Sequence, residues 1–222
     1  MIVAIDGPAG AGKSTVARLL ARRLGIGHLN TGAMYRALTL LARERGIAPG
    51  DASALGELAS DSEVRLVATP GEERVRIDGR DVTDEVGTAA VTADVSQVSA
   101  HPSVRAAVVA AQRSMLADGD WVADGRDVGS VVCPEADLKV FLTARPEERA
   151  RRRQAELRDR GEQRSLAEVR ADIDRRDHLD STRATSPLIV APGAHVIDTS
   201  DRSAEEVVDE LARLVALVRG TA

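Results

Sequence analysis

A phosphate-binding pattern, G-x-x-x-x-G-K-[ST], is filled near the start of the chain by Gly7-Pro8-Ala9-Gly10-Ala11-Gly12-Lys13-Ser14-Thr15. In such a loop, backbone N–H groups and the N-terminus of the next helix converge on the β-phosphate of a nucleotide. Lys13 would reach the β- and γ-phosphates, and the Ser14 hydroxyl would bind Mg²⁺. The pattern therefore predicts a nucleotide-phosphate site over residues 7–15.

The context of this loop favours a phosphate site over a glycine-rich connector with a chance lysine. Residues 1–6 form an apolar run of strand length, and residues 14–24 repeat apolar side chains at helical spacing before Gly25. A phosphate loop requires this order of strand, loop and helix. The chain also has only two lysines, Lys13 and Lys139, against 28 arginines, so a lysine in the loop departs from its general usage.

Charged side chains also follow two further expected strands. The apolar run 121–123 leads into Asp124-Gly125-Arg126-Asp127, and Arg36 lies in the first turn of the helix expected after a strand at 27–30. Open parallel sheets bind ligands at the carboxyl ends of their strands. We therefore expect these side chains near a ligand, although a lone arginine such as Arg36 is commonly just solvated.

A capping box, formed by Ser165 and Glu168, begins a helix whose inner face changes character along its length. That face carries first Leu166, Val169 and Ile173, and then, in the same register, Arg176, Asp180 and Arg183. Ion pairs within the helix would account for the charged part. An anionic ligand is the better explanation, because it would account for charged residues on the face of the helix that is directed toward the protein interior.

A second arginine-rich segment begins at the helix expected from Pro146 and reaches a loop at Gly161. It carries Arg149, Arg151, Arg152, Arg153, Arg158 and Arg160. Pairing with Glu147, Glu148 and Glu156 would make it an ordinary solvated face. Arginines that swing over bound phosphates would instead make it a lid. The residues alone leave both alternatives open.

The remaining pattern predicts how these residues are positioned. Five short strands alternate with helices, which predicts an α/β fold with a doubly wound five-stranded parallel sheet and the phosphate loop after its first strand. Residues 62–82 change to alternation of period two, with turn signals at Pro70-Gly71 and Asp78-Gly79. They predict a small antiparallel β insertion. A chain of 222 residues is long enough for one domain with such an insertion.

Composition argues against several classes of partner. A net charge of −5 and the small aromatic stock of Tyr35, Trp121 and Phe141 do not suit nucleic acid. Charge interrupts every apolar run before the ~18 residues that a membrane span needs. No basic residue precedes Lys13, so a signal peptide is not expected either. The single cysteine, Cys133, fits a reducing compartment. We expect a cytoplasmic protein without nucleic-acid or membrane partners.

The residues narrow the reaction to phosphoryl transfer. A regulatory GTPase needs an Asn-Lys-x-Asp guanine motif, but the only asparagine, Asn30, is followed by Thr31. Abundant arginine at sheet ends and helix starts suits bidentate phosphate contacts. Transfer between two phosphorylated substrates needs such cations, because donor and acceptor repel each other. A phosphate acceptor is already an anionic nucleophile, so positioning and charge stabilisation would suffice without a general base.

Several segments, spread along nearly the whole chain, share the order and residue types of one known family. They are Ile5-Asp6-Gly7-Pro8, Thr31-Gly32-Ala33-Met34-Tyr35-Arg36, Ser96-Gln97-Val98, Asp124-Gly125-Arg126-Asp127-Val128-Gly129, and Arg176-Asp177 leading to Arg183. Together these segments resemble bacterial cytidylate kinases, which are nucleoside monophosphate kinases. The Asp-Gly-Arg-Asp segment combined with the β insertion is not shared by adenylate, guanylate or shikimate kinases.

This resemblance implies transfer of the γ-phosphoryl group of ATP to CMP or dCMP, with ATP on residues 7–15 and Mg²⁺ at Ser14. The residues implied for the acceptor phosphate are Arg36, Arg126 and Arg183. Those implied for cytosine are Ser96, Arg105 and Asp127, with Thr31 nearby, and those for the sugar are Arg176 and Asp180. Thr31 stands where relatives often have serine, which keeps the hydroxyl. The catalytic set implied is Lys13, Arg36, Arg126, Arg183, Arg152 and Arg153.

The resemblance also implies how a single kinase domain over residues 1–222 is divided. Its core would comprise 1–31, 84–148 and 166–222. An acceptor-binding region with the insertion would span about 32–83, and an arginine-rich lid about 149–165. A monomer is expected. A kinase for another acceptor, such as UMP or shikimate, and a nucleotide-binding module without turnover both stay open.

Overall fold

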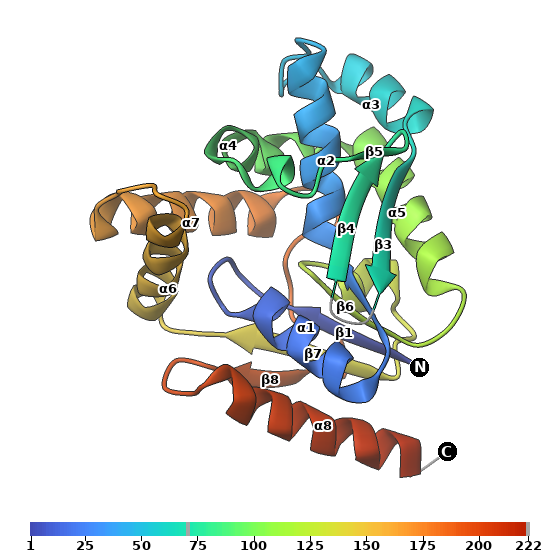
Figure 1. Cartoon of the computed structure of the whole chain (residues 1–222), viewed down its shortest axis with the longest axis vertical. Coiled ribbons are helices and arrows are strands. Elements are labelled where there is room, and N and C mark those ends of the chain that lie inside the picture. Colours follow the sequence, from blue (N-terminus) through green and yellow to red (C-terminus); the bar gives the residue numbers. More distant parts are fainter. Residues whose placement is uncertain (70–71, 221–222) are drawn as a thin grey trace.

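A five-stranded sheet forms the centre of the computed structural model, which describes residues 1–69 and 72–220 (Figure 1). The strand order is β2-β6-β1-β7-β8, and every neighbouring pair is parallel. The strands are β1 (Ile2–Asp6), β2 (Gly27–Asn30), β6 (Trp121–Gly125), β7 (Leu138–Thr143) and β8 (His195–Asp198). The doubly wound parallel sheet predicted from the sequence is therefore confirmed.

Helices cover both faces of this sheet, because successive side chains of a strand point to opposite sides. Val3 and Ile5 of β1 join an apolar cluster with α1 (Lys13–Leu24) and α8 (Ala204–Gly220). Ala4, between them, belongs to a second cluster with α2 (Thr31–Glu44) and α5 (Pro102–Leu116). These clusters pack apolar side chains against both faces of the sheet, whereas the carboxylates of Asp6 and Asp124 lie toward the carboxyl ends of β1 and β6.

The predicted insertion is a three-stranded antiparallel sheet, built from β3 (Val64–Thr69), β4 (Glu72–Ile77) and β5 (Arg80–Asp81). Its inward side chains, among them Leu66 and Ile77, pack into the same cluster as α2. Asp78 and Gly79 form the second predicted turn, both with positive φ (51° and 80°). The first, at Pro70-Gly71, lies outside the described residues.

Two helices differ from the sequence expectation. The Asn30 side chain accepts a hydrogen bond from the N–H of Ala33 (3.0 Å) and caps α2, so this helix begins at Thr31 and Arg36 lies in its second turn. A helix that the sequence reasoning did not specify, α3 (Ala52–Asp61), begins after Asp51, which caps it by accepting from the N–H of Ala54.

The remaining elements carry site residues. They are a 3₁₀ turn at Glu85–Gly87, α4 (Ala89–Val98), a π-helical turn at Val128–Val132, α6 (Pro146–Asp159) and α7 (Leu166–Thr182). In Figure 1, α6 and α7 lie together at one side of the molecule, beside α4 and away from the β insertion. Within the described residues, no helix has the length and apolar character that a bilayer crossing requires.

Candidate active site

The phosphate loop runs from the end of β1 to the N-terminus of α1, and two of its glycines have conformations that other residues cannot share. A Cβ on Gly7 would lie 2.0 Å from the carbonyl oxygen of Leu142. Gly12 caps α1 with φ 86°, in the left-handed region. The side chains of Ser14 and Thr15 in the first turn are exposed. The loop therefore presents backbone N–H groups and two hydroxyls to a ligand.

Lys13 and Ser14 have few bonds of their own in this loop. Lys13 is 6% exposed, and its Nζ donates to the carbonyl oxygen of Pro8 (2.7 Å). Burial and the neighbouring Arg126 charge lower the pKa of Lys13, and the negative charge of an incoming phosphate would favour its ammonium form. The Ser14 Oγ donates to Asp124 Oδ2 (2.6 Å).

The donors present fit Mg²⁺ held mainly by a nucleotide. Among residues 1–69 and 72–220, no group of three His, Cys, Asp or Glu side chains is arranged to hold a metal ion by itself. Mg²⁺ usually keeps several waters and takes one or two protein ligands in addition to substrate phosphates. Ser14, exposed beside the phosphate loop, is the hydroxyl that would complete such a set.

A second pocket opens at the carboxyl ends of β2 and β6. It brings together every residue that the sequence suggested for the acceptor, from five separate parts of the chain. The lining comprises Thr31, Gly32, Tyr35, Arg36, Val95, Ser96, Ser99, Arg105, Gly125, Arg126, Asp127, Arg176, Asp180 and Arg183. Their roles toward a ligand stay predictions, but their convergence in one pocket is a property of the fold.

Cations in this pocket outnumber their acidic partners. Within the described residues, neither Arg36 nor Arg176 forms an ion pair, and Arg176 Nε has no hydrogen-bond partner. Burial and the charge of Arg126 lower the pKa of Arg176 to about 10. Burial also lowers the pKa of Arg36, against the opposing effect of Asp124 and Glu73. Half-buried guanidinium groups that form no ion pair among the described residues favour an anionic ligand.

Asp127 and Asp180 are the two acidic side chains among the described residues that line this pocket, and Asp127 lies beside α5. Its Oδ2 forms an ion pair with Arg105, and its Oδ1 lies 3.7 Å from Nη2 of Arg183. Arg105 also donates to the carbonyl oxygen of Ser99 (3.2 Å) and lies over the ring of Tyr35, 5.2 Å from its centroid. The pocket is thus positive toward Arg36 and contains a rigid carboxylate toward α5.

The charged end of α7 contributes as its register predicts. Val169, Ile173 and Asp180 are buried on one face, whereas Leu166 at the start of the helix is 38% exposed. Asp180 Oδ2 accepts from Nε of Arg126 (2.9 Å). Arg183 follows the last helical residue and donates to the carbonyl oxygen of Ser186 (2.6 Å). The helix therefore changes from core to pocket within its length.

A buried carboxylate that the sequence reasoning did not single out positions the segment after Asp127. Asp6, at the end of β1, accepts hydrogen bonds from the N–H groups of Val128 and Gly129, both at 2.8 Å. Burial raises the pKa of Asp6 to about 6, although these two bonds oppose the shift. The sequence feature that could have identified Asp6 is a carboxylate that ends an apolar strand directly before a phosphate loop.

A cavity of about 390 Å³ lies on the other side of the phosphate loop. Its walls are residues 10–12, Thr15, Val16, Glu148, Arg152 and the segment 199–204 between β8 and α8. Segment 199–204 was also missed. Its hydroxyl and carboxylate residues follow the carboxyl end of a parallel strand, which is the signal that could have found it.

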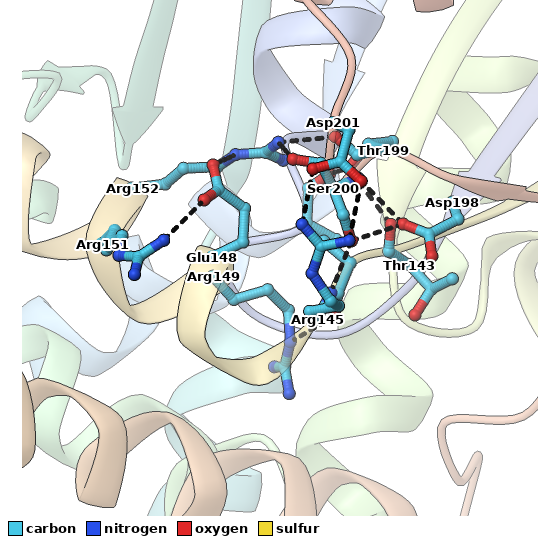
Figure 2. A network of polar contacts seen from close by, with 12 residues as sticks. Thr143, Arg145, Glu148, Arg149, Arg151, Arg152, Asp198, Thr199, Ser200 and Asp201 are labelled. Atoms are coloured by element: carbon cyan, nitrogen blue, oxygen red, sulfur yellow. Dashed lines mark hydrogen bonds and ion pairs between the residues drawn. The ribbon is translucent and has the colours of Figure 1, made fainter.

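The arginines of α6 have separate surroundings. Arg152 bonds Glu148 (3.0 Å) and donates to Oγ1 (2.9 Å) and the carbonyl oxygen (2.6 Å) of Thr199, as Figure 2 shows. Arg149 is buried and donates to the carbonyl oxygens of Ala144 (3.2 Å) and Ala9 (3.0 Å). Arg152 therefore borders the cavity beside the phosphate loop, whereas Arg149 holds the loop against the base of α6.

Arg153 points to another side of the same helix. It pairs with Glu156 (2.9 Å), and its charge contributes to the lowered pKa of both Arg36 and Arg176. Glu148 and Glu156 thus provide pairs of the kind expected for a solvated face. Arg152 lines the cavity beside the phosphate loop, and Arg153 lines a separate pocket between α4, α6 and α7. A lid role for these arginines stays a prediction.

A parallel sheet with a phosphate loop after its first strand, and a second cationic pocket beside that loop, define a phosphate-loop kinase. The chain belongs to the cytidylate kinase family, because the family model described as "Cytidylate kinase" matches residues 3–217.

Curated relatives agree with this family. The chain is 51% identical to a cytidylate kinase of Symbiobacterium thermophilum, over 96% of this chain and 95% of that protein. It is 46% identical to a cytidylate kinase of Carboxydothermus hydrogenoformans, over 97% of each. It is also 50% identical to a bifunctional pantoate ligase/cytidylate kinase of Parasynechococcus marenigrum, but spans only 42% of that protein's length.

Solved structures resemble the fold at low sequence identity. An uncharacterized protein from Eubacterium ventriosum has a TM-score of 0.54 and 10% identity, over 97% of this chain and 98% of that one. A gluconokinase from Sinorhizobium meliloti has a TM-score of 0.50 and 15% identity, over 99% of this chain and 94% of that one.

Proposed function

We propose that this chain is an ATP-dependent nucleoside monophosphate kinase that transfers the γ-phosphoryl group of ATP to CMP or dCMP, giving CDP or dCDP. The observation that carries the proposal is the pocket beside the phosphate loop, which combines a carboxylate held by Arg105 with arginines that form no ion pair among the described residues. A nucleoside monophosphate offers such a lining both an anionic phosphate and a hydrogen-bonding base. Membership of the cytidylate kinase family supports this acceptor.

The proposed acceptor contacts are those that the family resemblance implies, and all of their residues line this pocket. Arg36, Arg126 and Arg183 hold the acceptor phosphate. Ser96, Arg105 and Asp127 contact cytosine, where a carboxylate can accept from the 4-amino group. Arg176 and Asp180 contact the sugar. Thr31 lines the same pocket as the residues proposed to contact cytosine. The Thr31 hydroxyl donates to the carbonyl oxygen of Asp124 (2.7 Å).

Catalysis in this proposal consists of charge neutralisation and alignment. The acceptor phosphate is an anionic nucleophile, so no group has to remove a proton from it. Lys13 and the clamp arginines offset the charge of donor and acceptor, and Arg152 and Arg153 approach the transferring group when the segment 149–165 closes and excludes water. Mg²⁺, when bound with ATP at Ser14, would neutralise the β- and γ-phosphate oxygens.

The proposed division of the chain places acceptor binding in residues 32–83 and the lid in residues 149–165. The β insertion packs against α2, which carries Arg36, and this packing supports the first assignment. The turn between α6 and α7 is held by exposed side chains, which supports the second. A monomeric state and a cytoplasmic location stay predictions from the sequence.

The test is a coupled assay of ADP formation with a panel of acceptors. The expected result is ADP formation that depends on CMP or dCMP and is much slower with UMP, AMP, GMP or shikimate. Faster turnover of another acceptor would assign the pocket to that compound. Nucleotide binding without acceptor-dependent ADP formation would make the chain a binding module and would overturn the proposal.

A further inference from the structure

A buried histidine connects the β insertion to the strand that carries Asp124. His28, on β2, lies between two carboxylates, with its Nε2 2.8 Å from Oδ1 of Asp124 on β6 and its Nδ1 2.9 Å from Oε2 of Glu73 on β4. The histidine is 7% exposed and Asp124 is 2% exposed. The Glu73 side chain is 20% exposed. This contact therefore joins the insertion to the core sheet through charged groups largely removed from water.

The two carboxylates stabilise the imidazolium form of this histidine. Burial opposes that charge, but the contacts with Asp124 and Glu73 raise the pKa of His28 to about 9. At neutral pH His28 is therefore the imidazolium, and its two ring nitrogens contact Asp124 and Glu73 from separate strands.

The second oxygen of Asp124 reaches the phosphate loop. While Oδ1 contacts His28, Oδ2 accepts the hydroxyl proton of Ser14 at 2.6 Å. A hydroxyl has one proton and two lone pairs. With its proton directed to Asp124, the Ser14 oxygen has its lone pairs free on the exposed side of the loop. A cation bound with nucleotide phosphates would meet those lone pairs and not the proton.

We propose that Glu73 and His28 are positioning residues that, through Asp124, orient the Ser14 hydroxyl toward the Mg²⁺ of a bound nucleotide. This inference rests on the proposed function, since it concerns the metal that accompanies ATP. It gives the β insertion an effect on the donor side of the site, in addition to its place beside the acceptor. A purely structural role of the contact would instead hold the insertion against the core and affect acceptor binding and stability.

The experiment uses Glu73→Gln, which keeps the size of the side chain and removes its charge. The control is Glu63→Gln, on the same insertion, where the side chain is 60% exposed and pairs only with Arg65 among the described residues. ADP binding is measured by calorimetry with and without Mg²⁺, and KM is measured separately for Mg·ATP and for CMP. Melting temperatures are recorded for every variant.

Mg²⁺ should increase the affinity of the wild type for ADP. In Glu73→Gln we expect this increase to be about tenfold smaller, which is the lower end of the range for groups that orient metal ligands. ADP affinity without Mg²⁺ and KM for CMP should stay within error of the control, whereas the melting temperature should fall somewhat, because the buried His28 loses one of its two carboxylate partners. KM for Mg·ATP should rise. Equal affinities for Glu73→Gln and Glu63→Gln, with and without Mg²⁺, would overturn the proposal, as would a change confined to CMP or to the melting temperature.

A second variant tests whether Glu73 acts through His28. If it does, then Glu73→Gln should have no further effect on Mg²⁺-dependent ADP affinity in a His28→Gln protein. Additive losses of affinity would show that Glu73 does not act through His28.

The wild-type protein separates this inference from the proposed function. If the wild type forms ADP in response to CMP, an unchanged KM for Mg·ATP and an unchanged Mg²⁺-dependent ADP affinity in Glu73→Gln refute the inference alone. Absence of acceptor-dependent ADP formation in the wild type refutes the function.

Discussion

Replacing Asp127 by asparagine should narrow the preference for CMP over UMP. The carboxylate is 4% exposed and lines the acceptor pocket, held there by Arg105 and Arg183. A carboxylate has about four lone-pair sites, so these contacts leave room for the 4-amino group of cytosine. Uracil presents a carbonyl at the same place, which a carboxylate repels and an asparagine amide can donate to.

The size of the effect follows from one base contact. A good contact of this kind discriminates by about 1–3 kcal/mol, which is roughly a fivefold to 150-fold change in the ratio of kcat/KM for CMP and UMP. The same substitution leaves Arg105 and Arg183 without their shared counter-ion. Breaking a buried ion pair costs about 3–5 kcal/mol, reduced here because Arg105 keeps Ser99 and the Tyr35 ring. A lower melting temperature is therefore expected as well.

The assay tolerates this loss of stability. Both kcat/KM values come from one preparation, so the fraction of folded enzyme cancels in their ratio. Asp180→Asn is the matched control, because Asp180 is equally buried in the same pocket but bonds Arg126. It should lower turnover of both acceptors without changing the ratio. An active Asp127→Asn enzyme with an unchanged ratio would refute the reasoning and move discrimination to Arg105 and Ser96.

Three further predictions concern other parts of the site. Lys13→Ala should raise the activation free energy of turnover by about 3 kcal/mol and so lower kcat. The protein should still fold, since Nζ bonds only Pro8 within the described residues. A near-normal kcat would contradict the assignment of residues 7–15 as a phosphate loop. The pKa of Asp6 is raised to about 6 from an ordinary 3.8, so folding favours the protonated carboxyl. As pH rises from 3.8 to 6, the wild type should lose on the order of 3 kcal/mol of unfolding free energy relative to Asp6→Asn. Urea unfolding of both proteins across this pH range measures the difference, and a difference that stays constant contradicts the prediction. Replacing Arg152 and Arg153 by alanine should lower kcat strongly with little change in melting temperature, and hydrogen exchange over 149–164 should slow with a bisubstrate analogue; if neither happens, the segment is a solvated face.

Local patterns were enough to predict the phosphate loop and the parallel sheet. The loop is recognisable because a Cβ at Gly7 would clash with Leu142 and Gly12 has a positive φ, so both positions favour glycine. The register of α7 likewise predicted that Asp180 would follow Val169 and Ile173 inward. Each of these inferences uses residues within a few turns of one another, where helix and strand periods fix which side chains share a face.

Contacts between distant segments could not be predicted in this way. Glu73 and His28 meet only because the insertion folds back over β2, and no periodicity within β4 indicates that partner. Arg149 looked like one more arginine of an exposed row, yet it is buried because three backbone and carboxylate oxygens converge on it from other elements. Such pairings depend on the packing of whole elements, which a single segment of sequence does not encode.

Three carboxylates, two buried and one half-buried, link the donor and acceptor halves of the site. Asp6, beside the phosphate loop, holds the backbone after Asp127, and Asp124, on β6, holds Ser14 of the loop. Asp177 of α7 accepts from the N–H of Ala9 (3.0 Å), so the helix that carries Arg176 and Asp180 is fixed to the loop as well. Phosphoryl transfer depends on alignment of the reacting oxygens, and a misplacement of about 1 Å can cost a hundredfold in rate. These three carboxylates need not contact either substrate, and their replacement should lower kcat for every acceptor alike, unlike replacement of Asp127.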